Sequence, residues 1–397
     1  MSDVVESARC TGCGACAVAC PVSAISMDKE PDGFPHASIN DERCVSCGRC
    51  KKVCPTLNPP AMKSQVAAYA AQSTSPEVLK RSASGGAFFE LARTFLRKGG
   101  TVYGAAMRLE DSQARIAHQS ATSEAELVPL QNSKYAQGDA SVTFRQVEEE
   151  LRCGKHVLFS GLPCQVAGLY GYLGRDWPTL TTIDIFCHGN TSEAHLNLYL
   201  RFLHDKYHQD IVDYTFRDKE RGAGYTPRVV LANGKTMRMT ALQEAYWYLF
   251  QNSKFYRLSC HACPYACGQR VGDISLGDFW GIEQVRPELL AENGGPLDRT
   301  CGISAILANT TRGDELVRAS NLVLKDSSLA EIVPGGAAVR APQPMPQDRE
   351  HILELFRAGD YAAVKRYCIH QMGTAYLVDL VYDRAPVRLL RRLLGRP

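Results

Sequence analysis

Short apolar runs alternate with segments of helical periodicity through most of the chain after its first sixty residues. The segment Leu91–Lys98 has the pattern of a helix end, because two glycines follow it, and the run Thr101–Met107 then predicts a strand. The runs His156–Ser160 and Thr182–Phe186 predict two further buried strands, each followed by a helix. Strands that alternate with helices indicate an α/β arrangement in this part of the chain.

The later part of the chain has a different pattern. Arg228–Leu231 and Lys235–Met239 flank Asn233-Gly234, which is the strongest short signal for a β-hairpin. A proline-rich stretch at 342–346 then marks a break, and the residues beyond it are mostly helical in pattern. We therefore predict an α+β protein, in which a small domain precedes a larger mixed α/β domain and a helical C-terminus.

A cysteine motif occurs twice in the first sixty residues with the same internal spacing. Three closely spaced cysteines let their sulfurs converge on one iron-sulfur cluster, and the fourth cysteine, which a proline follows, is expected on the next helix. In two-cluster ferredoxins this fourth cysteine binds the other cluster. We therefore predict two 4Fe-4S clusters, the first held by Cys10, Cys13, Cys16 and Cys54 and the second by Cys44, Cys47, Cys50 and Cys20.

Zinc is the alternative use for these cysteines, because it also accepts four thiolates. Zinc sites usually present their ligands as two CxxC pairs, whereas here three close cysteines precede a fourth and a proline. The spacing and its duplication therefore favour iron-sulfur clusters. Asn58-Pro59-Pro60 is incompatible with a helix, so we expect the ferredoxin-type domain to span residues 1–60.

Only one feature of the composition, the number of cysteines, affects the predicted class of protein. The 397 residues are 45% hydrophobic and 22% charged with a net charge of +3, which is ordinary for a globular protein and gives no case for a nucleic acid partner. Sixteen cysteines would suggest a secreted disulfide-rich domain, but the N-terminus lacks a signal core and no apolar run is long enough to span a bilayer. We therefore expect a cytoplasmic protein, whose clustered thiols are metal ligands.

Four further cysteines lie beside polar or glycine-rich turns. Cys164 and Cys187 each follow a predicted buried strand, and Cys260 and Cys263 form a CxxC pair. The carboxyl ends of strands in open α/β sheets are where sites gather, so these four can converge on a metal. Lone cysteines are also common as small buried residues, as we assume for three others, and the residues alone leave both interpretations open. The three are Cys153, Cys301 and Cys368.

Two polar segments suggest a bound cofactor. Ser84-Gly85-Gly86 precedes an apolar helix, whose free amides and positive dipole end can hold a phosphate, although such a turn is more often only a helix start. Ser133-Lys134-Tyr135 can offer a donor, a cation and a ring to a flavin, although such a loop is usually just solvated. The two segments taken singly decide nothing.

The order of these motifs along residues 65–310 resembles the coenzyme F420 hydrogenase/dehydrogenase beta-subunit family. The motifs are Ser84-Gly85-Gly86, Ser133-Lys134-Tyr135, Gly161 to Gln165, Cys187-His188-Gly189, Phe216 to Lys219 and Gly272 to Gly281. The resemblance implies an FAD-binding domain with a 4Fe-4S cluster beside the flavin, often preceded by a ferredoxin module. We accordingly expect this domain to comprise residues 65–190 and 191–340, with a helical tail at 341–397.

The same resemblance implies roles for particular residues. It makes Cys164, Cys187, Cys260 and Cys263 the ligands of a third 4Fe-4S cluster, with Cys267 interpreted as structural. It implies that Ser84, Gly85, Gly86, Ser133, Lys134 and Tyr135 approach the flavin. His188, Lys134 and Asp278 are candidate proton donors near the flavin, although such residues are more often structural than catalytic. Leu162 and Asn190-Thr191 depart from the residues of many relatives, so we expect the loops around the flavin to differ.

The predicted function is an iron-sulfur flavoprotein oxidoreductase that passes electrons between a ferredoxin-like carrier and an unknown organic substrate. The segment Gly277 to Gly281 is similar to that of bacterial relatives associated with polysaccharide biosynthesis. One alternative is an input subunit that oxidises reduced coenzyme F420, a deazaflavin, and another is an electron relay or redox sensor without a substrate. The basic amphipathic segment 384–397 can contact a membrane or partner, although packing on its own domain is favoured.

Overall fold

The computed structural model describes residues 2–220, 222, 226–240 and 243–377. The basic segment 384–397, which was considered above as a membrane or partner contact, lies outside the described residues. Within the described ranges, no helix is both long enough and apolar enough to cross a bilayer.

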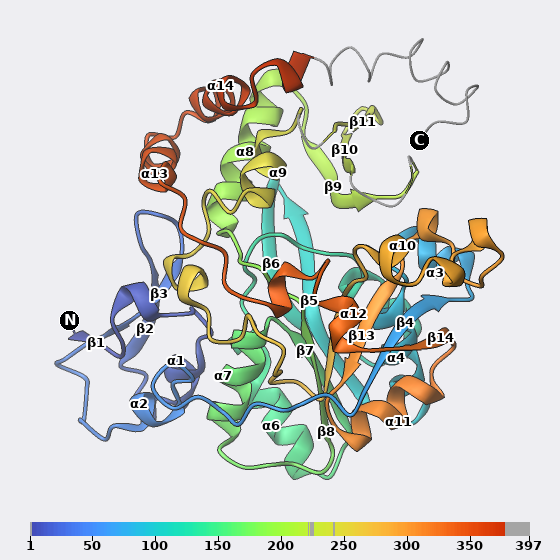
Figure 1. The fold of residues 1–397 in the computed structure, drawn as a ribbon. Helices are drawn as coiled ribbons and strands as arrows, with labels where there is room; N and C mark the ends of the chain where they lie inside the picture. Colours follow the sequence, from blue (N-terminus) through green and yellow to red (C-terminus); the bar gives the residue numbers. More distant parts are fainter. Residues whose placement is uncertain (1, 221, 223–225, 241–242, 378–397) are drawn as a thin grey trace.

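An eight-stranded mixed sheet forms the centre of the larger domain (Figure 1). Its strands, in spatial order, are β14 (Leu322–Ser327), β4 (Ala67–Ser73), β13 (Ser304–Ala308), β12 (Ile274–Asp278), β8 (Leu180–Ile185), β7 (Val157–Gly161), β5 (Thr101–Glu110) and β6 (Gln113–Ala121). Strands β12, β8, β7 and β5 are parallel, and the other pairings are antiparallel. The three strands predicted from apolar runs are therefore confirmed as β5, β7 and β8.

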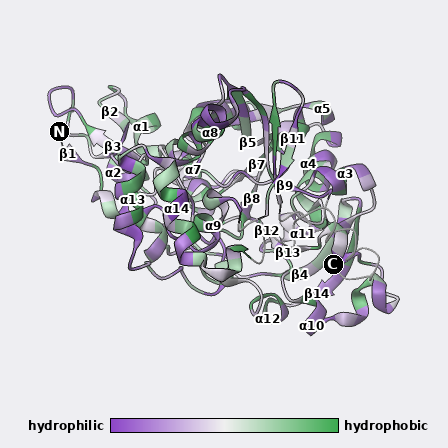
Figure 2. Ribbon diagram, turned by 90° about the horizontal axis from the view of Figure 1, so that it is seen from above, coloured by the Kyte–Doolittle hydropathy of each residue, from purple (hydrophilic) through white to green (hydrophobic). Residues whose placement is uncertain are grey.

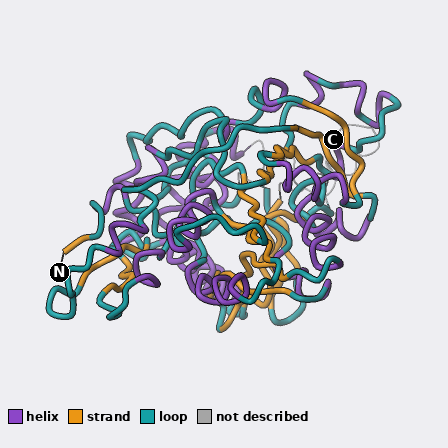
Figure 3. Tube along the Cα trace, turned by 90° about the horizontal axis from the view of Figure 1, so that it is seen from below, coloured by secondary structure: helices purple, strands orange, loops and turns teal. Residues whose placement is uncertain are grey.

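Helices cover both faces of this sheet, as the tube in Figure 3 shows. Helices α4 (Ala87–Arg97) and α11 (Thr311–Ala319) share an apolar cluster with Leu158 of β7, while α6 (Phe144–Arg152) and α7 (Pro163–Leu173) share another with its neighbours Val157 and Phe159. Because successive side chains of a strand point to opposite faces, β7 is buried on both. This explains why it reads as an uninterrupted apolar run.

The duplicated cysteine motif forms a small N-terminal module. Its antiparallel sheet has the order β1 (Ser2–Asp3), β3 (Pro35–Ile39), β2 (Ile25–Lys29), and its helices are α1 (Ala15–Ala19) and α2 (Arg49–Val53). The third cysteine of each motif lies on the helix, and the fourth is the residue that ends it. The expectation that the fourth cysteine lies within the helix is thus wrong, because each helix has only five residues.

A second lobe of the larger domain contains the predicted hairpin. Strands β10 (Thr226–Leu231) and β11 (Thr236–Arg238) pair antiparallel and β9 (Ile211–Asp218) completes their sheet, which confirms that prediction. Helices α8 (Glu193–Tyr207), α9 (Ala245–Gln251), α13 (Arg349–Arg357) and α14 (Tyr361–Met372) surround an aromatic core with this sheet. The helical pattern after the proline-rich stretch is therefore confirmed over the described residues, and the chain is α+β as predicted.

The remaining elements are short connections. They are the α-helices α3 (Pro76–Arg81), α5 (Glu124–Leu127), α10 (Ile282–Val285) and α12 (Leu329–Ile332), and the 3-10 helices η1 (Ser7–Arg9), η2 (Val128–Leu130), η3 (Ser141–Thr143), η4 (Leu258–Ala262), η5 (Pro287–Leu289), η6 (Ala291–Asn293), η7 (Arg299–Cys301) and η8 (Ala337–Val339). Among them η4 is important for the site, because its residues include the first cysteine of the CxxC pair.

The N-terminal module packs against α7, which lies between the module and the large sheet in Figures 1 and 2. Glycines on α7 permit the close approach: a Cβ at Gly168 would lie 2.9 Å from the Cys13 Sγ, and one at Gly171 would lie 2.3 Å from the Val53 carbonyl oxygen. The buried Arg257 also joins the two parts, because its guanidinium donates to the carbonyls of Cys10 (3.2 Å) and Pro35 (3.0 Å). The module is therefore fixed to the larger domain through its first cysteine loop.

Candidate functional site

The cysteines predicted for the first cluster line one small cavity in the N-terminal module. All four, Cys10, Cys13, Cys16 and Cys54, are buried. Burial raises the pKa of the Cys13 thiol to about 11 and also raises that of Cys16, and the neighbouring thiols add to both increases. A metal reverses this effect because it binds the thiolate form. Four buried thiols around one space are therefore suited to a metal cluster.

The cysteines predicted for the second cluster are more accessible. Cys20, Cys44 and Cys50 are half-buried, and Cys47 is exposed. Burial raises the pKa of Cys50, with further contributions from Cys44 and Cys47, so these three thiols lie close together. Backbone amides approach the sulfurs of Cys20 and Cys44 at 3.2 and 3.4 Å, and such contacts favour the thiolate and tune the potential of a cluster.

The structure also brings together the four cysteines of the predicted third site. Cys164 is the second residue of α7, Cys187 follows β8, Cys260 lies in η4, and Cys263 ends it. Burial raises the pKa of Cys164 well above its ordinary value, and the other three thiols add to the increase. Burial likewise raises the pKa of Cys260 to about 11, with a contribution from Cys263. Residues almost one hundred positions apart thus form one group of thiols.

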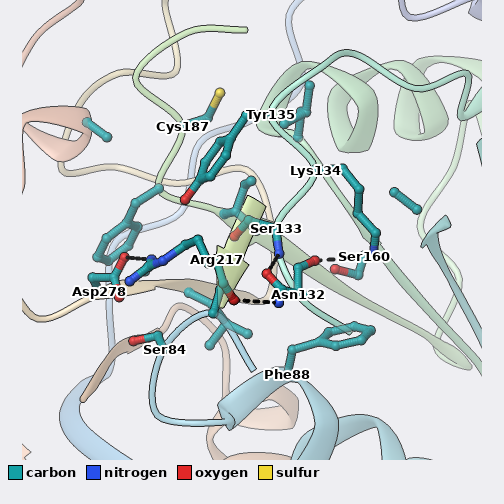
Figure 4. Close-up of a pocket in the computed structure, with 18 of the residues that line it drawn as sticks. Ser84, Phe88, Asn132, Ser133, Lys134, Tyr135, Ser160, Cys187, Arg217 and Asp278 are labelled. Carbon is teal, nitrogen blue, oxygen red and sulfur yellow. Dashed lines mark hydrogen bonds and ion pairs between the residues drawn. The ribbon is translucent and has the colours of Figure 1, made fainter. Parts of the chain in front are cut away.

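A cavity of about 420 Å³ lies at the carboxyl ends of β7, β8 and β12. Its walls include Gly161 after β7, Cys187 and His188 after β8, and Asp278 at the end of β12. The volume is in the range of small-molecule sites, about 300–1,000 Å³, and the carboxyl edge of parallel strands is where such sites form. Figure 4 shows part of the lining.

The Ser84–Gly86 turn closes one side of this cavity. Ser84 and Gly86 line it, and Gly86 begins α4 with a φ of 83°. Gly85 packs instead against β4 and β13, where a Cβ would lie 2.4 Å from the Ala71 carbonyl oxygen. The structure therefore places two of these three residues on the cavity and gives the third a packing role.

The Ser133–Tyr135 loop lines the cavity, but Lys134 is turned into its own loop. The Lys134 ammonium donates to the carbonyls of Pro129, Gln131 and Asn132 at 2.7–3.2 Å. Burial lowers the pKa of Lys134 to about 7, while the three carbonyls favour its charged form. This geometry gives Lys134 a role in fixing the loop, and its predicted role as a proton donor stays a prediction.

His188 lines the cavity as a neutral ring. The Tyr256 hydroxyl donates to the Phe250 carbonyl at 2.5 Å, so its oxygen accepts a hydrogen from His188 Nδ1 at 2.7 Å. Burial lowers the pKa of His188 to about 4, which leaves Nε2 with a lone pair at neutral pH. In this arrangement His188 Nε2 can accept a hydrogen bond from a ligand, and the predicted role of His188 as a proton donor stays a prediction.

Asp278 pairs with Arg217, a residue that belongs to one of the sequence motifs and has no predicted role. Arg217 is buried and its Nη1 donates to Asp278 Oδ2 at 2.6 Å, and Figure 4 shows the pair facing Ser133. Lys219, from the same motif, donates to the Ser84 and Cys301 carbonyls, both at 2.5 Å. The structure thus places Asp278 in an ion pair at the cavity, and its predicted role as a proton donor stays a prediction.

Sequence reasoning missed two buried residues of the cavity wall, His118 and Trp247. His118 Nε2 donates to the Ser160 carbonyl at 2.8 Å, whereas His118 Nδ1 and Trp247 Nε1 have no hydrogen-bond partner among the described residues. Buried polar atoms are normally paired, so these two nitrogens are exceptions in the wall of the cavity. Neither residue belongs to a short motif, so only their position in the fold reveals them.

The cysteines outside the three groups have mixed surroundings. Cys368 is buried as assumed, but Cys301 is only half-buried and Cys153 is exposed, so the assumption that all three are buried is wrong. Cys153 ends α6, where the helix reaches the surface. Cys267 lies near Cys263, and its thiol donates to the Gln269 carbonyl at 3.2 Å.

Two family models match the chain. Residues 9–58 match the 4Fe-4S dicluster domain, and residues 154–327 match the C terminus of the coenzyme F420 hydrogenase/dehydrogenase beta subunit. The first match supports two 4Fe-4S clusters in the N-terminal module, and the second relates the larger domain to the beta subunits of redox enzymes.

Comparisons with curated proteins and with solved structures say less about the chain than these family models do. No curated protein matches the chain at a significant level. A chain of the xenon-derivatized F420-reducing NiFe hydrogenase complex from Methanosarcina barkeri is similar at 18% identity with a TM-score of 0.44. The similarity covers 79% of this chain and 94% of that one.

The buried His118 predicts an acid-sensitive component of stability for the larger domain. Burial lowers the pKa of His118 from 6.5 to about 4, so the unfolded chain binds more protons between these values and stability falls as the pH drops through them. His118→Gln should remove on the order of 3 kcal/mol of this dependence between pH 7 and 4. Urea unfolding at several pH values measures it. The exposed His156→Gln is the control, and equal slopes in the two variants would contradict the prediction.

Proposed function

We propose that the chain is an iron-sulfur flavoprotein oxidoreductase, which passes electrons between a ferredoxin-like carrier and an organic substrate. One observation supports this most: Cys187 lines the cavity and also belongs to the group with Cys164, Cys260 and Cys263. A third cluster held by these thiols would border the space in which a cofactor binds. A flavin supplies two-electron chemistry, whereas each cluster carries one electron.

The residues of the cavity fit a flavin. Phe88, Tyr135 and Trp247 offer apolar and aromatic surface to its ring system. The α4 N-terminus beside Ser84 and Gly86 offers amides and a positive dipole end to a phosphate. In this proposal Tyr135 is positioned by ring contacts with Trp247 and Phe250, at centroid distances of 4.9 and 4.4 Å.

The substrate is proposed to be an organic molecule of polysaccharide biosynthesis. This rests on the similarity of Gly277 to Gly281 to bacterial relatives of that association, and Gly277 and Trp280 line the cavity. His188 Nε2 is a group that can accept a hydrogen bond from such a molecule, and the Arg217–Asp278 pair is the charged group that can orient it.

A second candidate is an input subunit that oxidises reduced coenzyme F420. The description of the matching family, which names this coenzyme, is the observation that favours it. Anaerobic mixing with the reduced coenzyme should then bleach the flavin absorbance, and an unchanged spectrum would exclude this reading. A relay or sensor without a substrate is a third candidate, but it leaves the 420 Å³ cavity without a use.

Anaerobic purification with analysis of iron, sulfide and flavin tests the proposal. Three clusters predict about 12 irons per chain together with one FAD, whereas the dicluster domain alone predicts about 8 irons. About 8 irons and no flavin would contradict the proposal and leave the relay reading. About 12 irons without flavin would contradict the flavin chemistry alone.

A further inference from the structure

The two copies of the cysteine motif lie in opposite environments although their spacing is the same. Between the cysteines, the first copy has small residues and its Cys13, Ala15 and Cys16 are buried. The second copy has an exposed Cys47 and an exposed Val45, 60% accessible. The spacing that positions the ligands is the same in both copies. The intervening residues differ because the two loops face different surroundings.

The first copy faces the interior and the third cysteine group. Cys13 packs against Gly168 of α7, one helical turn after Cys164, because a Cβ at Gly168 would lie 2.9 Å from the Cys13 Sγ. The Tyr265 hydroxyl donates to the Pro55 carbonyl at 3.4 Å, and its own carbonyl accepts from Arg270 at 2.9 Å. Tyr265 thus packs between the first cysteine group and the third.

The second copy faces away from this contact. Helix α1 joins the two groups, because it contains Cys16 of the first and ends at Cys20 of the second. The groups therefore follow one another in the order second, first, third, and Cys187 of the third reaches the cavity. An electron that crosses the whole series from outside must start at the second group.

The exposed surface around the second group is basic. We define the basic face as Arg43, Arg49, Lys51 and Lys52, all exposed, with Val45 and Cys47 among them. Asp41 and Glu42 are its acidic residues, so positive charge is in excess. Lys51 and Lys52 occupy the last turn of α2, next to the cysteine that ends it. An apolar residue surrounded by basic ones favours a negatively charged protein surface.

We propose that the basic face docks an acidic one-electron carrier protein of the ferredoxin class, and this rests on the proposed function. One electron leaves the reduced iron-sulfur carrier and is taken up by the chain at the second cysteine group, and no bond forms or breaks. Opposite charges speed the encounter and orient the partner. The first copy of the motif has no such surface, because α7 and Arg257 cover it.

The test measures binding of a purified acidic ferredoxin to the anaerobically purified protein by calorimetry. Lys51→Glu/Lys52→Glu should weaken binding about tenfold or more, and raising the salt concentration should weaken binding to the unmodified protein. Lys80→Glu/Arg81→Glu is the control, because these residues are exposed at the end of α3 on the far side of the molecule (Figure 1). Lys51→Gln/Lys52→Gln replaces the first variant if that variant loses iron.

Equal affinity of the basic-face and α3 variants would overturn the inference, as would binding that is insensitive to salt. Stopped-flow reduction of the clusters by the same ferredoxin should slow in the basic-face variant, while reduction by dithionite is unchanged. Slow reduction by both reagents would contradict docking as the cause. Absence of flavin would refute the proposed function but leave the binding result intact, so the two failures are distinguishable.

Discussion

Replacing Cys187 with alanine is expected to remove about four of about twelve irons while the N-terminal module stays loaded. Cys187 contributes one of the four thiols that lie close together. Without it, a cluster at this site has only three thiolates. Among the described residues, no other cysteine lines the cavity and could replace it. The flavin should also bind less tightly, because Cys187 forms part of the cavity wall. Iron analysis and the flavin absorbance spectrum measure the two effects.

Cys301→Ala is the matched control for this experiment. Cys301 is a half-buried thiol outside the three groups, and it donates to Asp298 Oδ2 at 3.4 Å. The iron content of the Cys301→Ala variant should equal that of the unmodified protein. Retention of all irons in Cys187→Ala would contradict the assignment of the third group. A parallel Cys267→Ala variant decides between Cys263 and its neighbour, since only the loss of a ligand should release iron.

Arg270→Met is expected to lower the free energy of unfolding by about 3–5 kcal/mol. Arg270 is 1% exposed and lies 2.7 Å from Asp184, which is fully buried, so the substitution leaves a carboxylate without its cation. The guanidinium also donates to the Tyr265 carbonyl and to the Ile185 carbonyl, both at 2.9 Å. It thereby joins the segment after the CxxC pair to the end of β8.

Urea unfolding of the anaerobic protein measures this loss. Arg318→Met is the control, because Arg318 is exposed and pairs with Asp314 at 2.8 Å within one turn of α11. Exposed pairs of this kind contribute little, so no change should be resolved. Similar unfolding midpoints in the two variants would contradict the role given to Arg270. If Arg270→Met loses iron and Arg318→Met does not, the Arg270–Asp184 pair also stabilises the third cysteine group.

The elements that the sequence predicted are those with local signals. Strand β7 contains an apolar run, β8 is rich in β-branched residues, and the β10–β11 hairpin has Asn233-Gly234 at its turn. Strand β4 was missed because its residues are mostly alanine, which has a low preference for strands. Its partners β13 and β14 lie more than two hundred residues later, and no local pattern indicates that pairing.

The candidate site also contains some residues that the sequence could predict and others that it could not. The motif spacing predicts which cysteines bind metal, and the structure brings Cys164 and Cys187 together with the CxxC pair. The surroundings of Lys134 and His188 could not be predicted, because they depend on carbonyls and a tyrosine hydroxyl that folding brings near. The same is true of Gly168, whose missing side chain has meaning only once the N-terminal module lies against α7.

The close packing of Cys13 against Gly168 also makes the two cysteine loops of the module unequally accessible. Because α7 covers the first cysteine loop, metal held there is shielded by the larger domain. The second loop, with Cys47 at the surface, has no such cover. Exposure to oxygen should therefore remove metal from the second cysteine group before the first.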